Sequence, residues 1–269
     1  MSDKSRQPVK KVVRPFVTGS PTDERTLGGA LGFFGVTLMV ALMTFLVCSM
    51  FTMKNTVLRT ALNMLVEVLV LFVFYNSAVG KGADAVARGE ILWQRQEKGQ
   101  SFSAGEKAVC FHPLKGYLTA LTGSIPALIC AVLLAIVTTR QTTNAGTIPA
   151  WLDTYRSRGE IGGALVAYTQ SAGMGVQDIL RIAVRIMIMP FVSMVGAENR
   201  DGMLLLEHLS PILVLLPALA YGTGYLQGRQ ERTKIHTGIA ESNRRRVRRE
   251  KKARKARMTP KPRTPEQLN

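Results

Sequence analysis

The amino-acid sequence predicts an all-α protein, a multi-pass bundle of transmembrane helices with four full spans. Three observations lead to this prediction. Hydrophobic residues make up 46% of the 269 residues and gather in long blocks, the formal net charge is +17, and nearly half of the basic residues fall in the last forty or so positions. A soluble core of this length would instead interleave apolar and charged residues at a period of 2 or 3.6.

The first apolar block covers residues 26–53 and contains no charged residue. It exceeds the ~20 residues that a helix needs to cross a hydrocarbon core. Because the basic, mostly polar residues 1–25 precede it, we expect an uncleaved first span rather than a signal peptide. Three glycines near its start (Gly29, Gly32 and Gly35) either let another helix approach closely or are ordinary glycines of a membrane helix.

Three further blocks complete the predicted bundle. Residues 60–80 are interrupted only by Glu67 and follow the first block after a short link, which predicts a helical hairpin. Residues 116–139 are uncharged, and residues 209–228 contain two prolines, which predict a kinked span. The domain order is then a basic N-terminal tail, a helical domain over 26–228 and a basic C-terminal tail.

Residues 178–197 are ambiguous, because Arg181 and Arg185 interrupt an otherwise apolar segment. Each arginine costs ~2.5–3.5 kcal/mol at the centre of a span, and the nine Leu, Ile, Val and Phe residues return roughly 3–5 kcal/mol in total. Asp178 and the two arginines share one helical face, as in an interfacial amphipathic helix. We therefore expect an interfacial or re-entrant segment, with a five-span bundle as the alternative.

The charge distribution favours four spans. The N-terminal tail is basic, and residues 229–269 carry fifteen Lys or Arg against four acidic residues. Positive segments beside spans stay in the cytoplasm, so an even number of spans places both termini there. This pattern is typical of multi-pass proteins of the bacterial cell membrane.

Residues 81–115 form the predicted inner loop, with six Lys or Arg. We expect a helix over Ala83–Gly99 and a capping box between Ser103 and Glu106 that starts a second, short helix. The loop is either a solvated connection or a docking element for a cytoplasmic partner. Other membrane subunits are also possible partners of the protein.

The C-terminal tail over residues 229–269 is predicted to be disordered, because its charge density leaves too little apolar surface to bury. Its candidate partners are anionic lipid headgroups or RNA, including the ribosome, although the tail has no aromatic residue for base stacking. A third interpretation is a topology anchor that only holds the last span in place. The candidate anion-binding residues are Arg244, Arg245, Arg246, Arg248, Arg249, Lys251, Lys252, Arg254, Lys255 and Arg257.

Glu67 is the costly residue within the spans, since an ionisable group at that depth usually faces the bundle interior. We hypothesise that Glu67 pairs with Arg181 or Arg185. The alternative is a protonated Glu67 hydrogen-bonded to a neighbouring helix.

No set of residues points to catalysis, a cofactor or a metal. His112, His208 and His236 are isolated in the sequence, and Cys110 with His112 lacks a second ligand pair. We therefore predict a non-enzymatic membrane component, a scaffold or accessory subunit that acts through its cytoplasmic loop and basic tail. The alternatives are a transporter or permease subunit with a polar path near Glu67, and a helper of protein insertion that docks ribosomes.

Overall fold

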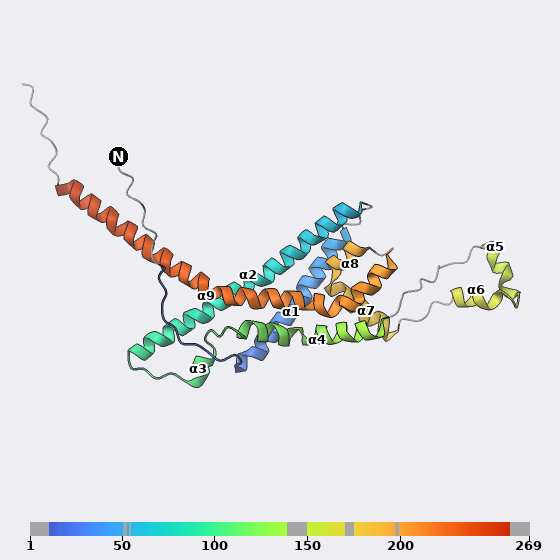
Figure 1. Cartoon of the computed structure of the whole chain (residues 1–269), viewed down its shortest axis with the longest axis horizontal. Helices are drawn as coiled ribbons and strands as arrows, with labels where there is room; N and C mark the ends of the chain where they lie inside the picture. The colour runs from blue at the N-terminus through green and yellow to red at the C-terminus, as the bar shows by residue number, and fades with distance from the viewer. Residues whose placement is uncertain are drawn as a thin grey trace, which may run out of the picture. The chain divides into compact units, whose positions relative to one another are not determined.

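A computed structural model describes residues 11–50, 53, 55–138, 150–169, 175–196 and 199–258, and every regular element in these ranges is a helix (Figure 1). The predicted all-α fold is therefore confirmed. Within these ranges, four helices are long and apolar enough to cross a membrane, as the sequence predicts. They are α1 (Glu24–Met50), α2 (Thr56–Glu97), α4 (Lys115–Val137) and α9 (Arg200–Met258).

The chain divides into two compact units. The first unit comprises Met1–Pro21, Val79–Pro113 and Tyr225–Asn269, and the second comprises Thr22–Ala78 and Leu114–Gly224. The two longest helices, α2 and α9, each contribute one part to either unit.

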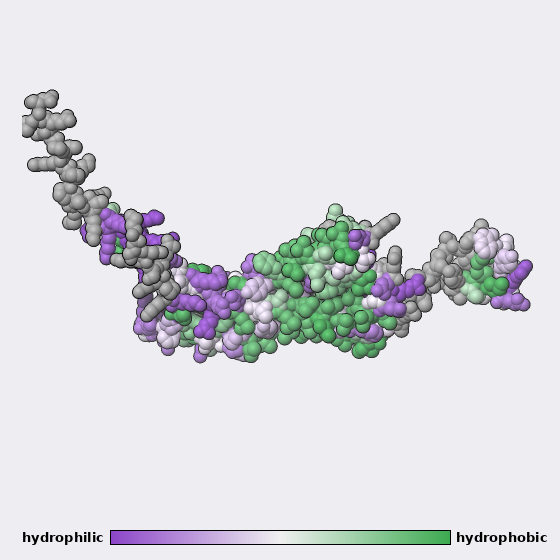
Figure 2. All heavy atoms as spheres, turned by 45° about the horizontal axis from the view of Figure 1, so that its top comes forward, coloured by the Kyte–Doolittle hydropathy of each residue, from purple (hydrophilic) through white to green (hydrophobic). Residues whose placement is uncertain are grey.

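The second unit contains α1, α4 and the apolar parts of α2 and α9. Many of their large apolar side chains are exposed, and in Figure 2 apolar residues form a broad continuous surface over this region. An exposed apolar surface of this extent is characteristic of helices that face lipid.

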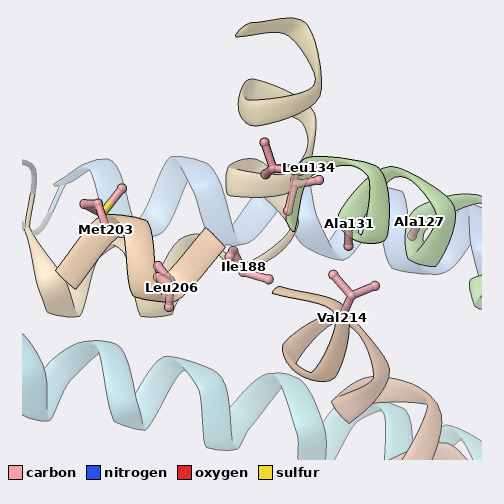
Figure 3. Close-up of a cluster of buried hydrophobic side chains, with 8 residues drawn as sticks. Ala127, Ala131, Leu134, Ile188, Met203, Leu206 and Val214 are labelled. Carbon is pink, nitrogen blue, oxygen red and sulfur yellow. The ribbon is translucent and has the colours of Figure 1, made fainter. Parts of the chain in front are cut away.

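The inner faces of α4 and α9 meet the segment around Ile188 in a compact apolar cluster (Figure 3). Small residues of α4, such as Ala127 and Ala131, let larger side chains of α9, such as Leu206 and Val214, approach closely. Ile188, which is 2% exposed, fills the space between them. This packing brings the segment before α9 into the interior of the unit.

The ambiguous segment 178–197 forms two short helices, α7 (Val176–Met187) and α8 (Met189–Val195). The chain breaks between them at Ile188, and Pro190 occupies the first turn of α8, where a missing backbone N–H costs nothing. Neither helix reaches the length that a span requires, so the segment adds no fifth long helix. Residues 150–169 form further short helices, α5 (Ala150–Asp153), η1 (Thr154–Ser157) and α6 (Gly162–Thr169).

The first unit contains the helix and the capping box that the sequence predicts for residues 81–115. The predicted helix over Ala83–Gly99 exists as the second part of α2, which continues unbroken from the apolar block to Glu97. The capping box is also confirmed, because the Ser103 hydroxyl accepts from the Glu106 N–H and the Glu106 carboxylate accepts from the Ser103 N–H at the start of α3 (Ala104–Ala108).

The prediction of a disordered tail is wrong for residues 229–258, which continue α9 as helix. The helix is already nucleated by the apolar part of α9, so each added residue needs only the favourable propagation step. Arg, Lys, Glu, Gln and Ala are good helix formers, and ion pairs such as Glu241–Arg245 and Arg246–Glu250 join neighbouring turns. Residues 259–269 lie outside the described part of the chain.

Candidate functional site

The second unit contains a buried ionic cluster centred on Glu207, which is 2% exposed. Arg181 of α7 donates from Nε to Glu207 Oε1 over 2.8 Å, and Arg185, one turn later, donates to the same oxygen over 2.5 and 3.0 Å. The Thr138 hydroxyl, at the end of α4, donates to Glu207 Oε2. The cluster therefore ties α4, α7 and α9 together through one carboxylate.

The cluster is close to electrically balanced. Asp178 Oδ1 lies 3.5 Å from the Arg181 guanidinium and supplies a second negative charge at the rim, where its side chain is 47% exposed. Breaking such a pair is expensive because it leaves a charge buried without compensation. The arrangement is thus a structural clamp of matched charges.

The hypothesis that Glu67 pairs with one of these arginines is wrong, because both guanidinium groups bind Glu207. Glu207 lies about two helical turns into α9. We predicted no ion pair for Glu207 from the sequence, although it is an acidic residue just before the apolar block 209–228.

The cluster also buries a charged side chain of α7 and leaves apolar side chains of this helix exposed. Arg181 is buried at 5% exposed, whereas Ile179 and Ile182 of the same helix are 57% and 47% exposed. An interfacial helix would direct its charged face to water. Asp178, Arg181 and Arg185 share one face as predicted, but the two arginines of this face bind Glu207 inside the protein while Asp178 stays at the rim.

A second polar group lies along one face of α2 in the same unit. Asn63 is fully buried, and its Nδ2 donates to the Arg59 carbonyl over 2.8 Å. Its Oδ1 and the Arg59 Nε find no hydrogen-bond partner among the described residues. Glu67 is 9% exposed, one turn beyond Asn63. Unsatisfied buried polar atoms of this kind require an explanation, because native structures hold few of them.

The first unit has its own buried ionic group, which joins α2 to α9. Glu90 is 5% exposed, and its two carboxylate oxygens bind different partners. Oε1 lies 2.7 Å from His236 Nε2, and Oε2 accepts from Arg232 Nε over 3.0 Å. The sequence showed His236 as isolated, although Arg232 and His236 lie one helical turn apart and share a face.

The N-terminal segment packs against this part of the first unit. The Val17 N–H donates to the Gly89 carbonyl over 3.1 Å, and the Gly19 N–H donates to the Phe111 carbonyl over 2.9 Å. Phe16 packs edge-on against Phe111. Residues 11–21 are therefore an ordered part of the first unit, held against α2 and the segment after α3.

The predicted anion-binding residues lie on the last turns of α9. Arg244 to Arg254 are exposed and the backbone through Met258 is helical, while the side chains of Lys255 and Arg257 lie outside the described ones. Successive residues advance by about 100° around the axis, so the basic side chains surround the helix. The segment has no apolar face with which to enter a bilayer.

Within the described residues, no three His, Cys, Asp or Glu side chains lie close enough to hold a metal ion. Cys110 is fully buried, and its thiol donates to the Glu106 carbonyl. Its contacts are therefore those of a packed core thiol.

Comparison of the chain with protein-family models, with curated proteins and with solved structures finds no match to any of them.

Proposed function

We propose that this protein is a non-enzymatic, multi-pass membrane component that presents a basic cytoplasmic helix to anionic lipid headgroups. The observation that carries the proposal is the continuity of α9, which runs from an apolar segment of span length into a basic helix without a break. A basic helix joined in this way to a span is anchored to the membrane, with its basic side chains roughly 24–44 Å beyond residue 228 along the helix axis.

The proposed topology places both termini in the cytoplasm. Four long apolar helices are an even number, so the chain returns to the side on which it began. The basic residues of the N-terminal segment, of residues 81–115 and of the second part of α9 then lie on one side, in agreement with the positive-inside bias.

The composition of the basic segment favours lipid headgroups over RNA as the partner. Each basic residue near an anionic surface contributes about 1 kcal/mol. Residues 229–269 contain no aromatic side chain, which base stacking on single-stranded RNA would use. Docking to the ribosome is therefore kept as the alternative that the binding experiment below distinguishes from lipid binding.

The experiment uses the full chain in nanodiscs of phosphatidylcholine and measures binding to vesicles with and without phosphatidylserine. One variant replaces Arg244, Arg245, Arg246, Arg248 and Arg249 with Gln, which keeps helix propensity. A matched control replaces the same five residues with Lys. We expect the Gln variant to lose more than tenfold in affinity for the anionic vesicles and the Lys variant to bind as the natural chain does.

Binding should also weaken as salt is raised, because exposed charges are screened. Equal binding to both kinds of vesicle would contradict the proposal. Salt-sensitive cosedimentation with ribosomes, in the absence of binding to anionic vesicles, would favour the ribosome-docking alternative.

The permease alternative has support from a different observation, the buried and incompletely satisfied polar groups of α2 around Asn63 and Glu67. The arginine pair would not line such a path, since both arginines are held by Glu207.

A further inference from the structure

Asn63 and Glu67 present two oxygen acceptors on one face of α2. Residues four apart in a helix are neighbours, with Cβ atoms ≈ 5–6 Å apart. Asn63 is fully buried and Glu67 is 9% exposed. The Asn63 amide nitrogen is committed to the Arg59 carbonyl, so the oxygen Oδ1 is the free end of this side chain, and no described residue donates to it.

The charged groups of the second unit leave Glu67 uncompensated. The Arg59 guanidinium lies against Gly196 at the end of α8, where a Cβ on that glycine would sit 2.7 Å from the guanidinium nitrogen. Arg59 is also two turns from Glu67, about 12 Å along the helix. Arg181 and Arg185 bind Glu207. Within the described residues, no cation forms an ion pair with the Glu67 carboxylate.

A thiol also lies near Glu67. Cys48 of α1 lies close enough to feel the Glu67 charge, and the Cys48 thiol is within hydrogen-bonding reach of Ser193 in α8. Within the described residues, Asn63 Oδ1 therefore accepts no hydrogen bond and the Glu67 carboxylate forms no ion pair.

A buried carboxylate without a partner is costly, and the cost falls when a proton or a cation binds. We propose that Glu67 and Asn63 are ligands of a binding site for a monovalent metal cation. Carboxylate and amide oxygens are the ligands of hard cations. One carboxylate neutralises one positive charge, whereas a divalent ion would leave net charge in a low-dielectric interior.

This inference is independent of the basic helix of α9, and it names a substrate class for the permease alternative. The two proposals can also fail separately, because the vesicle assay does not involve Glu67 and the assay below does not involve residues 244–257.

The test follows the reaction of Glu67 with dicyclohexylcarbodiimide, which modifies protonated carboxyl groups in apolar surroundings. The full chain is purified in detergent with choline as the only monovalent cation, and labelling is followed by mass spectrometry. A bound metal cation displaces the proton, so Na⁺, K⁺ or Li⁺ slows labelling. At ten times its dissociation constant the cation should slow the reaction about tenfold.

Two variants complete the experiment. Glu67→Gln identifies the labelled residue and should abolish the reaction. Asn63→Leu keeps the side-chain size and the reactive carboxyl but removes one ligand, so labelling persists while protection by the cation is lost. Asn76→Leu, at an exposed position of the same helix, is the matched control and should keep full protection. Thermal unfolding of each variant verifies that it is folded.

Labelling that none of the three cations slows would overturn the proposal and leave a protonated Glu67. Equal protection of the natural chain and the Asn63→Leu variant would also overturn it, since Asn63 would then not be a ligand. Absence of labelling in choline would overturn it as well, because an empty site must hold the proton.

Discussion

Arg181 and Glu207 form a buried ion pair, with 2.8 Å between Nε and Oε1, across 26 positions of the sequence. Both side chains are almost completely inaccessible, at 6% and 2% exposed. Arg185 binds the same oxygen, so one carboxylate holds two guanidinium groups. The pair fixes a helix that is too short to cross a membrane to one of the long apolar helices.

We predict that Glu207→Gln destabilises the protein by about 3–5 kcal/mol, because it leaves two buried guanidinium groups without their carboxylate. Unfolding of the detergent-solubilised chain measures the loss. Asp178→Asn is the control, since Asp178 touches Arg181 from a half-exposed position and should cost less than about 1 kcal/mol. Equal losses in the two variants would show that Glu207 is not the centre of the cluster.

A second ion pair, Asp23 with Lys115, should make stability depend on pH. Burial alone raises the pKa of Asp23, but the hydrogen bonds from Lys115 and Thr26 and the Lys115 charge outweigh burial and hold this pKa below its ordinary value of 3.8. The stabilisation is complete above pH 3.8 and is lost as the pH falls through the lowered pKa, because the unfolded chain binds the proton first.

Asp23→Asn removes this titration. We therefore expect the melting temperature of the natural chain to fall more steeply below pH 4 than that of the variant, with the two curves roughly parallel near neutral pH. A parallel course throughout the acidic range would contradict the ion pair. Glu24→Gln, at the exposed neighbouring position, should leave the acid dependence of the natural chain unchanged.

The close approach of α2 and α9 in the first unit requires glycine. A Cβ on Gly82 would overlap the backbone carbonyl of Tyr225, and a Cβ on Gly228 would overlap the backbone of Gly82 itself. Gly82→Ala should therefore destabilise the protein by about 1–3 kcal/mol, as overpacking does. The measurement is thermal unfolding followed by circular dichroism.

Gly80→Ala is the matched control on the same helix, because a Cβ at Gly80 meets nothing within 4 Å. This variant should be neutral or more stable by up to about 1 kcal/mol, as alanine is the better helix former. Similar behaviour of the two alanine variants would mean that the helices do not meet at Gly82.

The four long helices could be predicted from the sequence because span length and apolarity are local properties. The local sequence alone was enough to predict spans over residues 26–53 and 116–139. Each of the two predictions matches a helix to within a few residues. The capping box at Ser103 was predictable for the same reason, since both partners lie within one turn.

The partners of the buried charges were not predictable, because they depend on which helices pack together. Arg181 was correctly identified as costly, but it was paired with Glu67 from the sequence, whereas its partner in the structure is Glu207. The helical tail was missed for a different reason. Charge density was taken as evidence of disorder, although a nucleated helix extends readily through good helix formers such as Arg248.

The exposed isoleucines of α7 provide a test of whether this helix lies in lipid. Ile182 is 47% exposed, in contrast to the buried Arg181 that precedes it. A spin label at Ile182→Cys, in a chain whose three natural cysteines are replaced by alanine, should collide more with oxygen, which partitions into lipid, than with a water-soluble nickel complex. A label at Arg248→Cys on the basic helix should show the opposite preference, since that side chain is exposed.

Greater accessibility of position 182 to nickel would mean that α7 faces water. The inward-facing arginines would then hold together a surface helix, and α7 would have no part in the lipid-facing bundle.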